Sequence, residues 1–82
     1  MIDINNKVLS QQEMEKRVRN ITKLIEVGRM HAIQRMHMHG PEIGIMVKDG
    51  IIVWGALPET AEEDEKFVAG LLDRARAEAS RP

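Results

Sequence analysis

Residues 43–56, with the sequence IGIMVKDGIIVWGA, carry the pattern that decides the fold. Two runs rich in β-branched side chains flank the pair Asp49-Gly50. An Asp-Gly pair between such runs favours a two-residue β-hairpin, because both turn residues must adopt positive φ. We therefore expect an antiparallel hairpin over about residues 43–57, with its turn at Asp49-Gly50.

The two sides of this hairpin can be assigned, because a two-residue turn fixes the register of the strands. The expected core side consists of three opposite pairs, Val47 with Ile52, Ile45 with Trp54, and Ile43 with Ala56. The other side is more apolar than the solvent-facing side of a half-exposed sheet, since it carries Met46, Ile51 and Val53. Either another part of this chain or a second chain covers that side, and the sequence leaves both alternatives open.

A first helix is expected before the hairpin, over about residues 11–36. Ser10 and Glu13 form the pattern of a capping box at its start. A continuous helix of this length would span about 39 Å, whereas a six-residue strand spans only about 20 Å. The second half of the helix is also apolar away from its main seam, at Val27, Met30 and Ile33. These residues either contact a second chain, or the helix kinks at Gly28 and residues 30–38 fold into the core.

A second helix is expected after the hairpin, over about residues 61–78. Thr60 and Glu63 repeat the capping pattern at its start. Near the beginning of the sequence, the alternation of residues 1–4 indicates a short strand. We therefore predict a single domain over residues 1–82 with a small two-layer α+β fold, (β)αββα, in which the long N-terminal helix and the C-terminal helix pack on the antiparallel hairpin.

The composition excludes several classes of protein. The chain has 82 residues, a formal net charge of −1 and no cysteine, so disulfides and thiolate catalysis are excluded and no global field favours nucleic acid or a membrane. Because we find neither an apolar run of about 18 residues nor the pattern of a signal peptide, we expect a cytoplasmic location and no membrane partner. Six methionines stand beside only two aromatic residues, and methionine suits adaptable contact surfaces as well as irregular cores.

Patterns of catalytic and metal-binding residues are sparse. The hydroxyl side chains do not accompany a histidine at any recognisable spacing, and the glycines form no phosphate-binding motif. We therefore expect no enzymatic activity and no cofactor. His37 and His39 are the candidates for a metal site, because imidazole binds soft and borderline metals, but two ligands fall short of the four that a structural zinc site uses.

Charged side chains gather at two places. Lys16, Arg19 and Lys23 form a basic stripe on the first expected helix; the stripe is either a solvated helix face or, in a dimer, a contact for phosphates. The start of the second helix carries an acidic cluster that includes Glu62, Glu63 and Glu65. Acids complement the dipole there, and their excess would steer the approach of a basic partner.

The stretch over residues 47–69 resembles the hairpin-then-helix segments of two families, the BON domain and the DinI-like proteins that modulate a recombinase. The likeness to the second family rests on Gly55-Ala56 and the acidic run at residues 62–65. We assign the chain to neither family, because each likeness covers less than half of the chain and includes no specific motif.

The sequence thus predicts a non-enzymatic protein–protein interaction module, a small homo-oligomeric regulator or inhibitor that docks on another macromolecule. We expect a homodimer, and accessory proteins of bacteria, phages or plasmids fit this description. The expected contact residues come from the apolar sheet side, the late first helix and the acidic helix start: Met30, Ile33, Met36, Met46, Ile51, Val53, Glu62, Glu63 and Glu65. The alternative is a dimeric nucleic-acid-binding protein that uses Lys16, Arg19 and Lys23.

Overall fold

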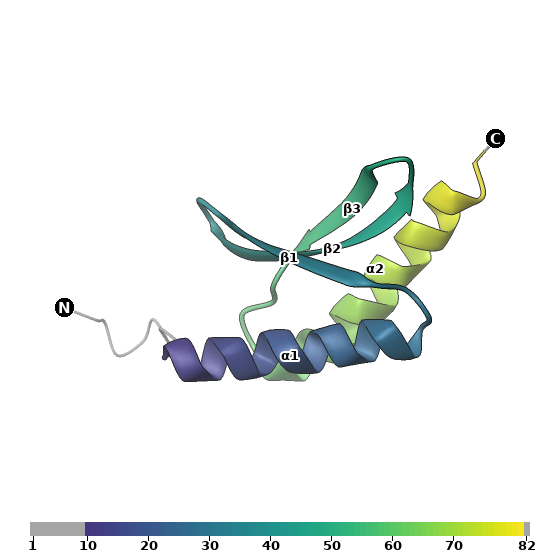
Figure 1. The fold of residues 1–82 in the computed structure, drawn as a ribbon. Helices are drawn as coiled ribbons and strands as arrows, with labels where there is room; N and C mark the ends of the chain where they lie inside the picture. The colour runs from purple at the N-terminus through teal and green to yellow at the C-terminus, as the bar shows by residue number, and fades with distance from the viewer. Residues whose placement is uncertain (1–9, 82) are drawn as a thin grey trace.

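A computed structural model describes residues 10–81 as two helices and a three-stranded antiparallel sheet (Figure 1). The elements follow in the order α1 (Gln11–Val27), β1 (Ala32–His37), β2 (Gly40–Lys48), β3 (Ile51–Ala56), the short 3-10 helix η1 (Ala61–Glu63) and α2 (Asp64–Ala79). This arrangement confirms the small α+β fold. The strand expected at residues 1–4 lies outside the described residues.

The start of α1 is where the capping pattern places it. The backbone N–H of Glu13 donates to Ser10 Oγ over 3.2 Å, and Ser10 has the extended backbone of an N-cap residue. This hydrogen bond satisfies one of the donors that a helix start leaves without an intrahelical partner. The apolar seam then buries Ile21 and Ile25 completely.

The end of α1 differs from the prediction of a helix to about Met36. The helix ends at Val27. The N–H groups of Gly28 and Arg29 close a tight final turn, because each donates to the carbonyl three residues earlier, at Ile25 and Glu26. Arg29 then adopts a φ of 64° and reverses the chain. After Met30 and His31, the residues Ala32–His37 form β1, which pairs with β2 along its whole length. Since α1 ends at Val27, no overlong helix favours self-association.

The hairpin β2–β3 turns where predicted but carries an irregularity that the sequence did not indicate. Asp49 and Gly50 adopt φ values of 36° and 87°, and Lys48 pairs with Ile51 as expected. Next to this pair, however, Met46 pairs with Ile52, so Val47 is the extra residue of a β-bulge.

The bulge shifts every pair beyond Lys48–Ile51 by one residue, so the predicted sides of the sheet are wrong for β3. Ile45 lies opposite Val53, and Trp54 lies opposite Gly44. Because a shift of one residue exchanges the two faces of a strand, Trp54 and Ile52 leave the predicted core side, and Val53 joins it. The expectation that Val53 belongs to the uncovered side is therefore wrong.

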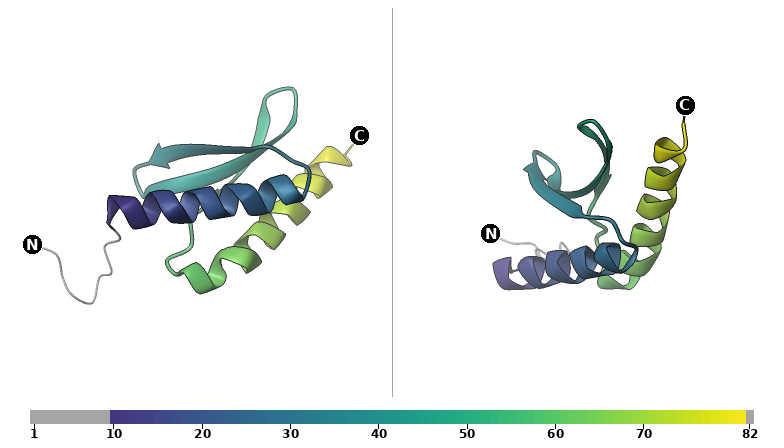
Figure 2. Two further views of the ribbon diagram at one scale, coloured as in Figure 1. Left: turned by 60° about the horizontal axis from the view of Figure 1, so that its bottom comes forward. Right: turned by 45° about the vertical axis from the view of Figure 1, so that its right-hand side comes forward.

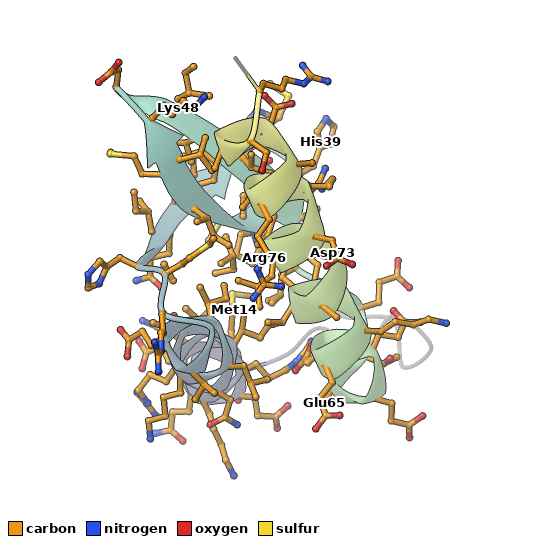
Figure 3. The ribbon with its side chains drawn as sticks, turned by 90° about the vertical axis from the view of Figure 1, so that its right-hand side faces the viewer. Met14, His39, Lys48, Glu65, Asp73 and Arg76 are labelled. Atoms are coloured by element: carbon orange, nitrogen blue, oxygen red, sulfur yellow. The ribbon has the colours of Figure 1, made fainter. Side chains whose placement is uncertain are left out.

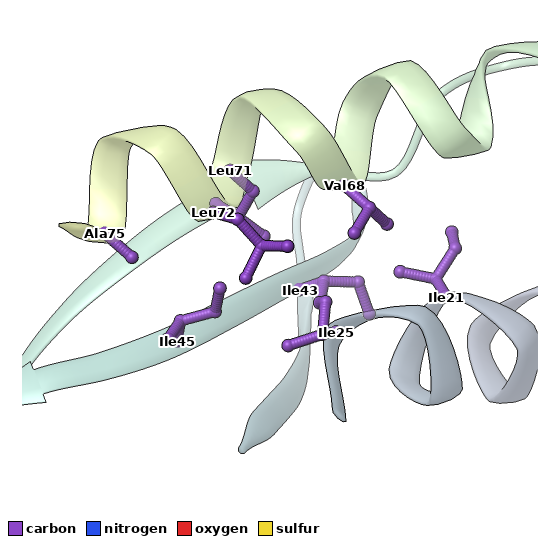
Figure 4. Packing of buried hydrophobic residues seen from close by; sticks show 8 residues of the cluster. All are labelled: Ile21, Ile25, Ile43, Ile45, Val68, Leu71, Leu72 and Ala75. Carbon is purple, nitrogen blue, oxygen red and sulfur yellow. The ribbon is translucent and has the colours of Figure 1, made fainter. Parts of the chain in front are cut away.

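Both helices pack on one side of the sheet. The left view of Figure 2 shows α1 and α2 below the strands and no helix above them. The core between these layers, drawn in Figure 4, consists of Ile21, Ile25, Ile43, Ile45, Val68, Leu71, Leu72 and Ala75. Val53 and Phe67 pack against this cluster, and the ring of Phe67 lies on Gly55, where an added Cβ would come within 2.7 Å of it. In the part of the chain that is described, no helix is long and apolar enough to cross a bilayer.

Candidate functional site

The side of the sheet opposite the helices is the first candidate surface, and we call it the open face. No helix among residues 10–81 covers it (Figure 2). The alternation of the strands and the bulge at Val47 bring six residues together there: Ile33 and Arg35 from β1, Gly44 and Met46 from β2, and Ile52 and Trp54 from β3. A sheet side without a covering layer ordinarily carries polar side chains, whereas four of these six are large and apolar.

Trp54 is held in a defined position at the centre of the open face. Its ring lies over Gly44, where an added Cβ would come within 2.6 Å of the ring. The guanidinium carbon of Arg35 lies 3.8 Å from a ring centroid, in the position of a cation–π interaction. Glu42 fixes that guanidinium in turn, because Arg35 Nε donates to Glu42 Oε1 over 2.9 Å. Backbone and side chains on three strands thus restrict the rotamers of Trp54 before any partner arrives.

The open face carries residue types that are enriched in protein interfaces. Tryptophan and arginine are enriched among the residues that contribute most to binding energy, and such residues cluster at the centre of a contact surface. Met46 adds an adaptable apolar side chain that is 53% exposed. Ile33 and Ile52 are half-buried beside it. The arrangement offers a fixed aromatic anchor within an apolar surround, and it presents no reactive group in a catalytic constellation.

The structure separates the six apolar residues that the sequence grouped as contacts. Ile33 and Met46 lie on the open face, whereas Met30 and Val53 pack against the core. Ile51 is 54% exposed at the hairpin end, and Met36 is 71% exposed on β1. Trp54, Ile52 and Arg35 were missed because the predicted register placed the first two in the core.

A groove between α1 and the second half of β1 is a second surface. It has a volume of about 600 Å³ and is open to solvent. Met14, Val18, Met36 and Pro41 supply its apolar lining, and Figure 3 shows Met14 on the side of α1 toward the sheet. Other lining residues are polar or charged and include Glu15, Arg19 and Gln34.

A buried ion pair explains one of the acidic residues at the start of α2, Asp64. Arg17 and Asp64 are 8% exposed each, and Arg17 Nη2 lies 2.5 Å from Asp64 Oδ1. The same guanidinium donates to the carbonyls of Pro58 and Thr60, each over 2.9 Å. Arg17 therefore joins α1 to the β3–α2 connection and to the start of α2. A signal existed in the sequence, since Arg17 occupies a helical position between the seam residues Met14 and Ile21.

The remaining acidic residues of this cluster are free of that network. Glu62, Glu63 and Glu65 are all exposed. Figure 3 shows Glu65 at the N-terminal end of α2, far from Lys48. The capping box predicted at Thr60 does not form, because Thr60 makes no side-chain hydrogen bond to the helix start. A 3-10 turn closed by Glu63 N and Thr60 O takes its place.

The basic stripe and the histidines complete the sequence-predicted candidates. Lys16, Arg19 and Lys23 are exposed on α1, and within residues 10–81 none of them forms an ion pair. His37, at the end of β1, and His39, in the turn that follows, have ring centroids 5.7 Å apart. In the described range no group of three or more histidine and carboxylate side chains is placed to hold a metal ion.

Comparison with known proteins adds no relative to this geometry. No protein-family model matches the chain, and neither a curated protein nor a solved structure matches it at a significant level.

Proposed function

We propose that this chain is a non-enzymatic protein–protein interaction module, a small homo-oligomeric regulator or inhibitor that docks on another protein through the open face of its sheet. One observation supports the proposal above the others: Trp54 is held between Gly44 and Arg35 on a sheet side that no helix in residues 10–81 covers. A held aromatic side chain loses little conformational entropy when it binds, so more of its contact energy contributes to affinity.

The surround of Trp54 supports a protein partner in particular. Ile33, Met46 and Ile52 come from three different strands and spread an apolar contact area around Trp54, as suits a broad protein surface. Arg35 brings a charge whose partner, Glu42, is already in place, so burial of this pair does not leave an unpaired ion.

The exposed acids of η1 and α2 fit the same proposal as a steering charge. Glu62, Glu63 and Glu65 lie outside the buried Arg17–Asp64 pair and are available to a basic surface. Charges at the rim of an interface accelerate association more than they tighten it. In this proposal the open face supplies affinity and the acidic cluster supplies attraction.

The proposal is tested by affinity purification with three versions of the chain: wild type, Met46→Asp and Val27→Asp. Met46 lies on the open face at 53% exposure, whereas Val27 is 81% exposed at the end of α1. Both substitutions put the same charge at an exposed apolar site, so neither should unfold the chain. We expect a protein that wild type and Val27→Asp retain and Met46→Asp does not.

The recovered protein is then purified and titrated against the three versions by calorimetry. We expect Met46→Asp to weaken binding by roughly tenfold or more, because a charge enters an apolar contact. A partner that binds wild type and Met46→Asp equally well would reject the open face as the docking surface. Failure to find any protein whose binding depends on Met46 would reject the docking function itself.

A further inference from the structure

The two outer edges of the sheet differ in how their backbone groups are engaged. Leu57 N donates to Pro41 O, one residue beyond the pair Glu42–Ala56. In an antiparallel ladder, pairs that exchange hydrogen bonds alternate with pairs that do not. The neighbouring pair Glu42–Ala56 therefore has no mutual hydrogen bonds, and the same holds two residues further on for Gly44–Trp54. The N–H and C=O groups of Ala56 and Trp54 therefore point away from β2, toward the outer edge of β3. Arg74 occupies that edge, because its Nη2 donates to Trp54 O over 2.9 Å.

Within residues 10–81, the outer edge of β1 carries no such contact. Since Glu42 and Gly44 direct their backbone groups to β1, their partners Arg35 and Ile33 are hydrogen-bonded to β2. The groups that point outward belong to Ala32, Gln34 and Met36. Among residues 10–81, no hydrogen bond outside the ladder engages the backbone of these three. An outer strand of this kind is a template for another strand, and β1 has neither a proline nor a bulge to prevent pairing.

We infer that the free edge of β1 pairs with β1 of a second copy of this chain, antiparallel about a two-fold axis at Gln34, so that the two sheets become one of six strands. This inference rests on the homo-oligomeric part of the proposed function and not on the docking partner. It assigns the contact between copies to β1 and leaves the open face of each copy free for that partner.

The side chains of β1 favour this register over the one with its axis at Arg35. With the axis at Gln34, Ala32 lies opposite Met36 and Ile33 lies opposite Arg35. The large, 71% exposed Met36 thus meets a small residue. An axis at Arg35 would set two arginines directly opposite each other, which is destabilising in a cross-strand pair.

The groove beside β1 supplies the contact that strand pairing alone lacks. Two six-residue strands bury less than the roughly 1,000 Å² of a specific interface. The groove of about 600 Å³ lies along the same edge and is lined by Met14, Val18 and Met36. Its α1 wall also carries Glu15 and Arg19, one turn apart and of opposite charge, and an antiparallel second copy presents the same two charges in reverse order. A second copy therefore matches the edge in hydrogen bonds, apolar surface and charge.

The test compares wild type with Gln34→Pro and Ala56→Pro by sedimentation velocity over a range of concentrations. Proline at Gln34 removes an outward N–H and leaves the ladder with β2 intact; Ala56→Pro makes the matched change at the outer edge of β3. We expect dimers for wild type and Ala56→Pro and monomers for Gln34→Pro. Met36→Lys, an exposed substitution that leaves the backbone unchanged, is also expected to be a monomer, and circular dichroism checks that each variant is folded.

Hydrogen exchange of single amides identifies the edge directly. In the wild-type dimer the amides of Gln34 and Met36 should exchange slowly, and in Met36→Lys the amide of Gln34 should exchange fast. A wild type that is monomeric at every concentration would overturn the inference. So would a dimer whose Gln34 amide exchanges fast, because that dimer uses another surface. These measurements use the purified chain alone, so a monomer would reject only the homo-oligomeric part of the proposed function. If the chain forms dimers but no docking partner is found, only the docking part is rejected.

Discussion

The two sides of the sheet are made from the same three strands and have opposite surroundings. On the helix side, Ile43 and Ile45 are fully buried against α1 and α2. On the open face, Trp54 lies over Gly44 and is covered by one side chain, Arg35, in place of a layer of helices. The difference teaches that a single bulge at Val47 decides which of the hairpin's apolar residues become core and which become surface.

Arg17→Ala should have the largest effect, because Arg17 holds the helix side together across three elements. The substitution leaves Asp64 as a buried charge and removes donors from the carbonyls of Pro58 and Thr60. Removal of one partner of a buried pair costs about 3–5 kcal/mol, which is a large share of the stability of a small domain. Urea denaturation measures the loss, with the exposed Lys16→Ala as control at about 0.5 kcal/mol or less. A loss below about 1 kcal/mol for Arg17→Ala would show that the pair does not hold the helix layer.

A comparison of adjacent residues on β2 tests the two sides themselves. Ile45→Ala removes a side chain that is fully buried on the helix side, and Met46→Ala removes one that is 53% exposed on the open face. We expect a loss of about 2–4 kcal/mol for Ile45→Ala, from lost burial and a cavity. Met46→Ala should cost less than about 1 kcal/mol. Equal losses in thermal or urea unfolding would mean that the open face is covered as fully as the core.

Two glycines test the register that the bulge imposes. An added Cβ at Gly44 would come within 2.6 Å of the side chains of Ile52 and Trp54, whereas Gly70 in α2 has nothing within 4 Å. Gly44→Ala should therefore destabilise the chain by about 1–3 kcal/mol through overpacking. Gly70→Ala should stabilise it by roughly 0.5–1 kcal/mol, because alanine is the better helix former. A neutral Gly44→Ala would indicate that Trp54 does not lie over Gly44.

The smallest expected effect concerns the basic stripe, which lies on neither side of the sheet. Replacement of Lys16, Arg19 and Lys23 together by alanine should change stability by no more than about 0.5 kcal/mol per site. It should also leave the docking partner bound. Gel-shift titrations with duplex and single-stranded probes decide the alternative function. Wild-type binding that weakens steeply with salt and disappears in the triple variant would support nucleic-acid binding and contradict a purely protein partner.

The elements that local chemistry specifies were predicted from the sequence. Ser10 predicted the start of α1, and Asp49-Gly50 predicted the hairpin turn. The second helix was also expected at about its observed position, although its first turn is the 3-10 segment η1. In each case the decisive residues lie within a few positions of one another.

Features that depend on pairing between segments were not predicted. Residues 32–37 fit a continued helix by their apolar spacing, although β2, the partner that makes them a strand, begins only three residues later at Gly40. The break before them uses a left-handed Arg29, a conformation that few residues other than glycine adopt. The pair Arg17–Asp64 joins residues 47 positions apart, and a 3-10 turn stands where the capping box was expected at Thr60.

The candidate site was predicted only in part for the same reason. An apolar sheet side in need of cover was expected and is present, and Ile33 and Met46 belong to it. Its central residue, Trp54, was assigned to the opposite side because a regular two-residue hairpin contains no bulge. The difference of one residue at Val47 moved the main aromatic anchor from the predicted core to the surface.

The emission of Trp54 tests the central claim most directly, because it is the only tryptophan in the sequence and lies in the middle of the open face. The purified partner is titrated into the chain while tryptophan emission and its quenching by acrylamide are recorded. Where the partner contains tryptophan, a tryptophan-free fragment or variant of it is used, so that the emission comes from Trp54 alone. We expect the emission to move to shorter wavelength and quenching to fall as the partner binds, in wild type and Val27→Asp alike. Binding detected by calorimetry with no change in the emission or quenching of Trp54 would contradict docking through the open face.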